Sequence, residues 1–373
     1  MKRRLPRSRQ RQQGGFILLT VLAMLVVLVL LASAAATTAD RVRADQQLDD
    51  ARLAGQLDAR STEATLLYLL ATQRRTFAGL TVDARIVYTP SELAEKAHGE
   101  FVTTLMPVGN ELRMNDEVYS GLGSSRFALM TDAGRANISM NPVLRQNWLI
   151  QLKTSPQEQS RLSDTLLDYQ SPGNFPRLNG AKADQYREKG LQPPPERTLF
   201  TPLELRRVMD WGKLLAPMDD ATLLNTLTTV RPNPIDVNAA PLSVLMMLPG
   251  VTRTMAERVV ALRNVQAFVD NASVYTLLPT LDEESDSIGL YPSDSGTMAL
   301  WPDATGAGTL VHWTLTPFDN GGSPWHIDYE LRLPARAGGN DAPPHQPQTP
   351  LLGDTQAAHP GQSDATPGSG ASD

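Results

Sequence analysis

The sequence predicts an α+β fold in which a long N-terminal helix packs on an antiparallel sheet and an inserted all-α domain interrupts the sheet-forming part of the chain. Three observations support this fold. An uncharged run at 16–36 leads into a segment that stays free of proline up to about residue 73. Strand-like runs occur within 77–135 and again within 308–334. Patterns typical of helices fill much of 136–307 between them.

The N-terminal region has the charge pattern of a membrane anchor. Residues 1–15 carry six Lys or Arg and no acid, and the 21 residues of 16–36 carry no charge. A helix of that length rises roughly 31 Å, which matches the hydrocarbon core of a bilayer. Since a basic flank stays in the cytoplasm, we expect a single-pass protein of the bacterial inner membrane, with a cytoplasmic N-terminus and a periplasmic bulk.

Three interpretations fit this N-terminus. Ala34, Ala35 and Ala36 offer the small residues of an ordinary secretory cleavage site after the apolar core. A plain anchor would stay uncut. In the third interpretation Gly15 ends a basic leader directly before Phe16 and the apolar run. That order is typical of a prepilin, and it favours cytoplasmic cleavage after Gly15, N-methylation of Phe16 and a membrane helix that stays on the mature protein.

Beyond the membrane the helix is expected to continue over 37–76. Leu53, Leu57, Ala64, Leu67 and Ala71 recur at spacings of three, four and seven, and so form one apolar stripe. We expect one half of this stripe to pack on the chain's own domain and the other half to pack on other subunits. Leu53 and Leu57 are the assembly candidates.

The predicted strands have different signatures. The runs 84–88 and 126–130 are short and rich in strand-forming residues. Near the end of the chain, hydrophobic residues alternate with polar ones across Trp325, Ile327, Tyr329, Leu331 and Leu333. This run follows 311–316 across a turn-like Asp-Asn-Gly-Gly at 319–322, which predicts a hairpin. From 335 to 373 the composition predicts a disordered tail.

The segment 236–263 has the pattern of a helix-hairpin-helix (SAM-like) motif. Asn238 is the predicted N-cap, and Pro249 with Gly250 forms the turn between two apolar-faced helices. Such hairpins often bind DNA phosphates through backbone amides. Here Thr252 stands at the usual second glycine, so we expect the motif to be structural.

The composition excludes several classes of site. The chain of 373 residues has a net charge of −6 and no cysteine, which excludes disulfides and thiolate chemistry. It has no P-loop, no Gly-x-Ser-x-Gly elbow and no paired histidines at a metal-binding spacing, so we predict no enzyme, no cofactor and no nucleic-acid partner. One run of carboxylates is a candidate for calcium, although such runs are more often solvated loops: Asp282, Glu283, Glu284 and Asp286.

From Gly14 to about Leu333 the chain resembles the minor pseudopilin K family of type II (general) secretion systems. Four passages carry the resemblance in order: Gly15 with Phe16; the segment 131–141 (Thr-Asp-Ala-Gly-Arg-Ala-Asn-Ile-Ser-Met-Asn); 167–169 with 179–181, Tyr186 and 193–195 leading into 203–205; and the helix-hairpin-helix. The resemblance implies a pilin-like domain formed by 77–135 and 308–334, with 136–307 inserted as the helical domain.

The resemblance also implies a function at the tip of a pseudopilus. Most pilin-like proteins carry Glu at the fifth mature position, where this chain has Thr20. The lack of that Glu fits a subunit with no preceding neighbour. The implied partners are pseudopilins I and J, the major pseudopilin and the prepilin peptidase. One departure is the loop 170–174, which has no carboxylates, so it gives no support to a cation site there. The alternative is a membrane-anchored DNA receptor for uptake.

Overall fold

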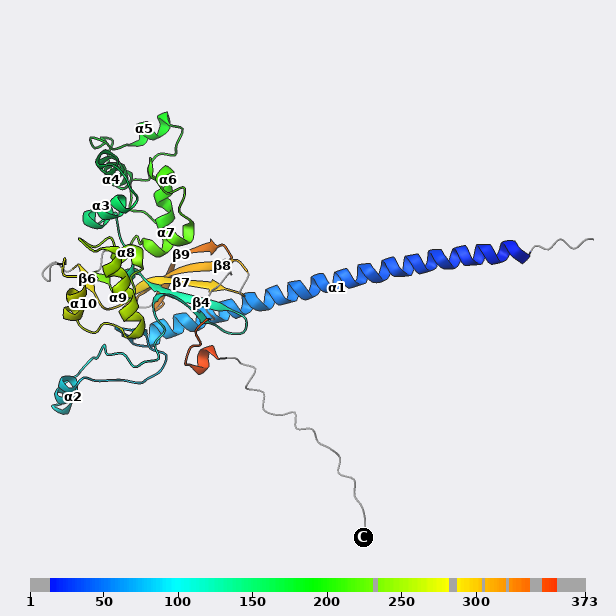
Figure 1. Cartoon of the computed structure of the whole chain (residues 1–373), viewed down its shortest axis with the longest axis horizontal. Helices are drawn as coiled ribbons and strands as arrows, with labels where there is room; N and C mark the ends of the chain where they lie inside the picture. The colour runs from blue at the N-terminus through cyan, green and yellow to red at the C-terminus, as the bar shows by residue number, and fades with distance from the viewer. Residues whose placement is uncertain are drawn as a thin grey trace, which may run out of the picture. The chain divides into compact units, whose positions relative to one another are not determined.

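The structure is a computed structural model that describes residues 14–230, 234–281, 287–303, 306–319, 322–335 and 344–353. The chain divides into two compact units, Met1–Ala54 and Gly55–Asp373. The first helix, α1 (Gly14–Thr72), contains the point of division. Figure 1 shows the elements in chain order.

Helix α1 has an apolar part and a packed part. In the described residues, Leu18–Thr72 is the one helix long and apolar enough to cross a membrane. Near its C-terminal end, Leu66, Leu69 and Leu70 are buried against the sheet, whereas Ala64 is exposed. The face of α1 that packs on the sheet is therefore rotated relative to the predicted stripe. Of the stripe residues near this end of the helix, only Leu67 is buried. The reason is that the leucines of 66–70 offer more apolar area than the alanines of the stripe.

A five-stranded antiparallel sheet forms the centre of the second unit, in the order β3-β4-β7-β8-β9. Its strands are β3 (Asn115–Ser120), β4 (Arg126–Thr131), β7 (Ser295–Trp301), β8 (Gly308–Leu315) and β9 (Trp325–Leu333). Alternate residues of these strands face opposite sides, as the pleat requires. Phe127, Leu129 and Trp313 join the core that includes the end of α1, and Ala128 with Leu310 join a second core on the other face.

The predicted strand at 126–130 and the hairpin of β8 with β9 are confirmed. The predicted strand at 84–88 is wrong. Two backbone carbonyls of that run accept hydrogen bonds from side chains instead of a neighbouring strand: Arg85 from Arg74 and Val87 from Thr104.

The predicted boundaries need two corrections. Strand β7 lies inside the range 136–307 that was predicted to be helical, and it pairs with both β4 and β8 in the middle of the sheet. The predicted tail from 335 is ordered at 344–353. Its His345 bridges to Tyr119 of β3, and its Leu352 is buried in the core beside α1.

The segment between β4 and β7 is mostly helical and has one extensive core, which collects buried side chains from Ala136 to Leu290. Its helices are α3 (Pro142–Gln151), α4 (Pro156–Gln170), α5 (Ala183–Glu188), α6 (Trp211–Leu214), α7 (Asp220–Thr226), α8 (Leu242–Leu245), α9 (Arg253–Val265) and α10 (Asn271–Leu277), with 3-10 turns η1 (Asp132–Gly134) and η2 (Pro202–Arg207). The segment is not all-α, because β5 (Ile235–Asp236) pairs in parallel with β6 (Ile288–Gly289).

Three smaller elements complete the described fold. They are the hairpin of β1 (Arg75–Thr76) with β2 (Gly79–Leu80), the helix α2 (Pro90–Ala97) and the 3-10 turn η4 (Pro350–Leu352). In Figure 1, α2 lies apart from the other helices. Its first turn is held by a capping box between Thr89 and Glu92, with Pro90 at the start of the helix.

Candidate functional site

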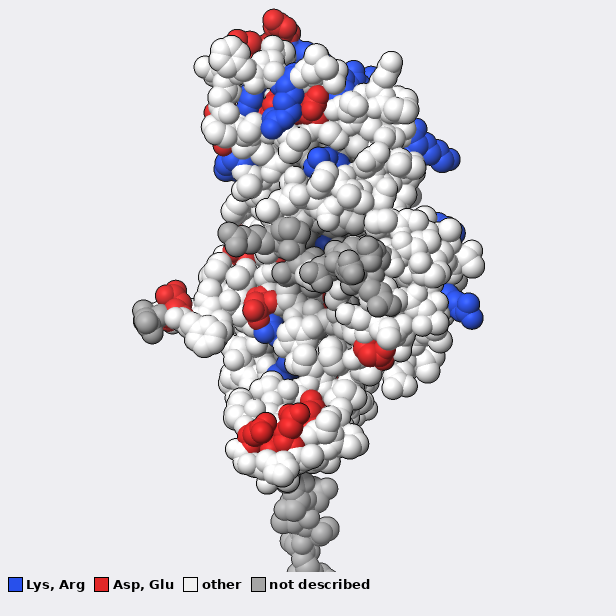
Figure 2. All heavy atoms as spheres, turned by 90° about the vertical axis from the view of Figure 1, so that its left-hand side faces the viewer, with Lys and Arg blue, Asp and Glu red and all other residues white. Residues whose placement is uncertain are grey.

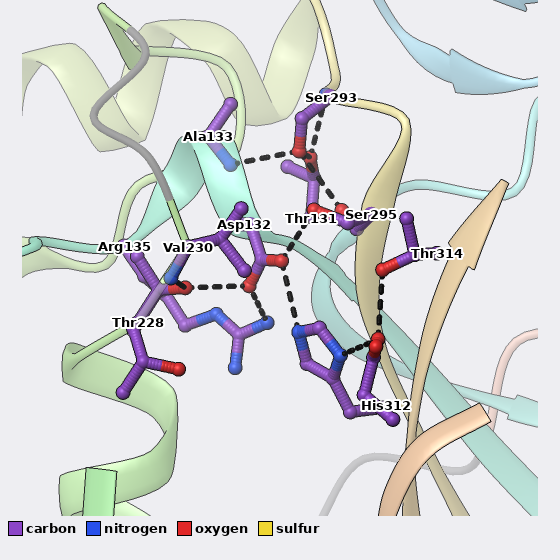
Figure 3. A network of polar contacts seen from close by, with 12 residues as sticks. Thr131, Asp132, Ala133, Arg135, Thr228, Val230, Ser293, Ser295, His312 and Thr314 are labelled. Atoms are coloured by element: carbon purple, nitrogen blue, oxygen red, sulfur yellow. Dashed lines mark hydrogen bonds and ion pairs between the residues drawn. The ribbon is translucent and has the colours of Figure 1, made fainter. Parts of the chain in front are cut away.

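A buried polar centre lies where the sheet meets the turn that follows β4 (Figure 3). Each carboxylate oxygen of Asp132 accepts two hydrogen bonds. Oδ1 accepts from Arg135 Nη2 at 2.5 Å and from Thr228 Oγ1 at 2.9 Å. Oδ2 accepts from Ser295 Oγ at 2.5 Å and from His312 Nε2 at 2.9 Å. One carboxylate therefore joins four segments that are far apart in the sequence.

His312 lies between two carboxylates. Its Nε2 is bonded to Asp132, and its Nδ1 is 2.7 Å from Asp328 Oδ2. An ionised carboxylate only accepts hydrogen bonds, so both bonds form when both ring nitrogens of His312 are protonated and the imidazole carries a positive charge. Burial lowers the pKa of His312, but the bonds to the two carboxylates outweigh burial and raise that pKa above its ordinary value.

The centre is balanced in charge. Burial raises the pKa of Asp132, but the nearby charges of Arg135 and His312 overcome this effect and hold the pKa well below its usual range. The two carboxylates of Asp132 and Asp328 are thus matched by two cationic side chains, those of Arg135 and His312. Arg135 also donates to the backbone oxygen of Leu224 at 3.0 Å, which connects the centre to α7. This balance of charge favours the ionised groups in the protein interior, and Arg135 Nε is the atom of the guanidinium that has no hydrogen-bond partner within the described residues.

This centre joins parts of the fold that are distant in the sequence. Asp132 is 3% exposed and His312 is 3% exposed, and the Asp132 carboxylate already accepts four bonds, so no substrate can reach it. Asp132 and Arg135 belong to the segment 131–141 that carries the family resemblance. Sequence reasoning did not identify either residue, or His312, as part of a site. The sequence feature that could have indicated this centre is His312, a histidine at an inward-facing position of the predicted strand 311–316.

A second buried pair lies in the segment predicted as helix-hairpin-helix. Asp236 accepts a bond from the Asn238 N–H at 2.9 Å, and Arg263 Nη1 donates to the carbonyls of Val237 and Ala240 at 2.7 and 2.6 Å. Asp236 and Arg263 interact electrostatically, but no hydrogen bond joins their side chains in the described part of the chain. Burial therefore dominates both groups: it raises the pKa of Asp236 to about 7 and lowers the pKa of Arg263 to about 10.

Asp236→Asn is expected to stabilise the protein at pH 8 and to change its stability little at pH 4. The pKa of Asp236 is about 7 in the folded protein and 3.8 for an unperturbed aspartate side chain. A raised pKa gives stability that is present below the unfolded value and is lost as the pH rises through about 7. That difference in pKa corresponds to roughly 4 kcal/mol at most. Urea unfolding at both pH values measures it, and an equal change at pH 4 and pH 8 would contradict it.

The helices α8 and α9 flank a turn at Gly250, whose φ of +69° favours glycine and whose Cβ would meet Thr280 at 2.8 Å. The prediction that Asn238 caps the first helix is wrong. Helix α8 begins after Pro241, and the Asn238 side chain instead bonds the backbone N–H and carbonyl of Phe268. Thr252 caps α9 by accepting from Met255 N at 3.4 Å.

This turn is poorly suited to binding phosphates. The Thr252 hydroxyl is used in capping its own helix, and Arg253 pairs with Glu257 at 3.3 Å. Arg263, the basic residue of the last turn of α9, is buried on backbone carbonyls. Of the cations on this helix, only Arg258 is left exposed without an ion pair within the described residues. A single arginine neutralises too little charge for tight DNA binding.

A cavity of about 340 Å³ lies beside the C-terminal end of α9, with Arg113, Glu111, Asn238 and Arg263 in its wall. Two of these side chains already form hydrogen bonds with the backbone that lines the cavity. Glu111 accepts from the N–H groups of Val108 and Gly109, and Arg113 donates to Asn264 O at 2.9 Å. In the described residues no three His, Asp or Glu side chains are grouped as metal ligands. The calcium candidates Asp282, Glu283, Glu284 and Asp286 lie outside the described residues.

The processing and assembly candidates all lie on α1. Gly15 and Phe16 lie in its first turn, and Thr20 follows about one turn later with an exposed side chain. Leu53 is 56% exposed and Leu57 is 60% exposed. None of these residues belongs to the buried polar centre. They lie at separate positions along one helix, and Leu53 and Leu57 each expose an apolar side chain that suits packing against other helices.

Comparison with known proteins gave a similarity to a solved structure. No protein-family model matches the sequence, and no curated protein matches it. The structure is similar to a chain in the crystal structure of the GspK–GspI–GspJ complex from the type 2 secretion system of enterotoxigenic Escherichia coli. The TM-score is 0.46 and the sequence identity is 12%, and the match covers 78% of this chain and 99% of that chain.

Proposed function

We propose that this chain is a minor pseudopilin at the tip of a type II secretion pseudopilus. There it initiates and caps the assembly of the pseudopilus and supports the export of folded proteins across the outer membrane. The observation that carries the proposal is the single continuous helix α1. Its N-terminal part is an exposed apolar span, and its C-terminal part is packed on an antiparallel sheet. A helix of this kind anchors the domain in the membrane and offers a surface for neighbouring helices.

The N-terminal residues fit this proposal. Cleavage by a prepilin peptidase after Gly15 would leave Phe16, N-methylated, at the start of the membrane helix, with the bulk of the chain in the periplasm of a bacterium. A charged N-terminus in lipid is costly unless a partner neutralises it. Thr20 has no carboxylate to neutralise the amine of a neighbour, so the chain suits a tip position better than that of a repeating subunit. The mostly helical segment between β4 and β7 adds bulk that also disfavours close repetition.

The proposed partners are pseudopilins I and J, with the major pseudopilin below them. Leu57 is 60% exposed on α1, although Gly55 and Thr62 on either side of it are buried, Thr62 against the loop between β3 and β4. Burying a leucine of this kind at an interface contributes roughly 1.5 to 3 kcal/mol. Leu57 therefore is expected to contribute to the contact with a neighbouring subunit without supporting the chain's own core.

The assembly test uses the periplasmic domain, from about Asp40, with the corresponding domains of pseudopilins I and J. Light scattering should show a defined complex of the three, and no filaments of this domain alone. Leu57→Asp should weaken the complex by roughly 10- to 100-fold, because it places a charge where apolar packing is required. Leu53→Asp should act in the same direction.

The matched control is Gln56→Asp, which puts the same charge on an exposed polar position of the same helix. It should leave the complex intact, and thermal unfolding should be unchanged for both variants. If the wild-type domains remain monomeric when mixed, or if this chain alone forms filaments, the tip-subunit function is wrong.

A further inference from the structure

One edge of the five-stranded sheet is the strand β3, which pairs with β4 on its inner side. On its outer side, the carbonyl of Val118 and the N–H of Ser120 point away from β4 and toward residues 344–353, here called the strap. An uncovered edge of this kind is a template on which another chain can add a strand. What covers the edge therefore decides whether the chain pairs with others there.

The strap covers the edge through His345. The His345 N–H donates to Val118 O at 2.9 Å, and the His345 carbonyl accepts from Ser120 N at 2.9 Å. Side chains add to this contact. His345 Nε2 lies 2.6 Å from Glu117 Oε1, and Gln346 Nε2 donates to Ser120 Oγ at 2.9 Å. The two outward backbone groups of β3 are thus already bonded within the chain.

The far end of the strap is anchored in the core. Leu352 is 2% exposed and belongs to the core that includes the end of α1 and the sheet, whereas its neighbour Leu351 is 46% exposed. The turn η4 that presents Leu352 is capped by Thr349, whose hydroxyl accepts from the Leu351 N–H at 3.3 Å. The strap is therefore held at two points, by backbone pairing at His345 and by the burial of Leu352.

The strap does not itself offer a new edge. Pro344, Pro347 and Pro350 occur at every third position of it. Proline has no backbone N–H, so it cannot donate to a further strand. After His345 the strap makes no other backbone hydrogen bond with β3 within the described residues. It ends the sheet on this side.

We propose that the strap keeps a second copy of this chain from pairing along β3. When the strap leaves, the outward groups of Val118 and Ser120 become free, and the same edge of another copy offers matching donors and acceptors. Two identical edges can pair in the antiparallel direction about a twofold axis, which closes the assembly as a dimer. The proposal does not depend on the function proposed above.

The charges of the molecule neither drive nor prevent such a dimer. On the face drawn in Figure 2, Lys and Arg are interspersed with Asp and Glu over the upper part, where α4 and α5 lie. A mixed surface produces no strong field of one sign to attract another copy. On β3 itself, Glu117 lies 3.7 Å from Arg113, so it keeps a cationic neighbour when the strap leaves. Backbone pairing is therefore the interaction that the strap controls.

The test shortens the full-length chain, in detergent micelles that cover the apolar part of α1, and measures its mass by light scattering. A chain that ends at Pro343 lacks the strap and should dimerise at about a tenfold lower concentration than the intact chain, the effect of one or two backbone hydrogen bonds. The matched control ends at Gly353, keeps the strap and should behave like the intact chain. Adding Ser120→Pro to the strapless chain should restore the monomer, because proline removes the outward N–H.

Point variants test the same proposal without truncation. Leu352→Ser removes the anchor and should promote dimers, whereas Leu351→Ser makes the same change at an exposed position and should not. Near-ultraviolet circular dichroism of the buried Trp313 shows whether the sheet stays folded in each variant. If loss of the anchor unfolds the sheet, His345→Pro decides the question, because it removes the N–H that bonds Val118 and leaves the core unchanged.

The outcomes distinguish pairing at β3 from other association. Dimers that form when the strap is lost and disappear with Ser120→Pro would support the proposal. A folded strapless chain that remains as monomeric as the intact chain would overturn it. Dimers that persist with Ser120→Pro would form at another surface, such as α1, and would overturn it as well.

Discussion

Asp132→Ala is expected to lower the free energy of unfolding by roughly 3 to 5 kcal/mol, the loss typical of a broken buried ion pair. Arg135 and His312 would remain buried without the carboxylate that balances them. Ser295 and Thr228 would each lose a hydrogen-bond acceptor. Urea unfolding followed by tryptophan fluorescence can measure the change, because Trp313 is buried in the sheet beside this centre.

The control for Asp132→Ala is Asp184→Ala, which removes an acid whose side chain is 83% exposed. Exposed ion pairs contribute about 0 to 1 kcal/mol, so the control should change little. A loss below about 1 kcal/mol for Asp132→Ala would show that the centre does not hold the sheet and the helical segment together.

The pH dependence of stability gives a second measure of the same centre. The folded-state pKa of Asp132 lies below its unfolded value, so its stabilisation is present above that value and is lost as the pH falls through the folded pKa. The pKa of His312 is raised, so its contribution is present below pH 6.5 and is lost as the pH rises through the folded value. Asp132→Ala should therefore reduce the loss of stability on the acid side.

Local sequence patterns were sufficient to predict the long N-terminal helix and the last hairpin of the sheet. An uncharged run of helical length is visible without knowledge of any partner, and so is the alternation from Trp325 to Leu333, because β9 is an edge strand with one solvated side. Strand β7 was missed for the opposite reason. All seven of its residues are buried, so no alternation with polar residues marks it as a strand.

The polar centre depends on contacts that no local pattern records. Asp132 and His312 are 180 positions apart, and Ser295 and Thr228 come from two further segments. Each of these residues is unremarkable in its own stretch of sequence. In the same way, composition averaged over 335–373 hid a short ordered piece, in which His345 pairs with the edge of β3 and Leu352 fills the core.

Gly15→Val is expected to abolish processing almost completely. A peptidase must bring its catalytic groups close to the backbone between residues 15 and 16, and glycine permits such an approach because it has no side chain. Valine would place a branched side chain at that peptide bond. The variant should accumulate as the full-length precursor, which retains the 15 residues of the leader. Because the basic leader would remain on the cytoplasmic side of the helix, the precursor should not enter a pseudopilus, and secretion should fall with it.

Intact-mass measurement of the membrane-extracted protein decides this prediction. The wild type should begin at an N-methylated Phe16 and keep its apolar span, while Gly15→Val should begin at the original N-terminus. Gly14→Val serves as the control, since it adds the same side chain one residue away from the cleaved bond and should still be processed. A wild-type protein that begins after Ala36 would show ordinary secretory cleavage and remove the membrane helix from the mature chain. A wild-type protein that keeps its leader would leave a plain anchor, and both outcomes would exclude assembly through a prepilin route.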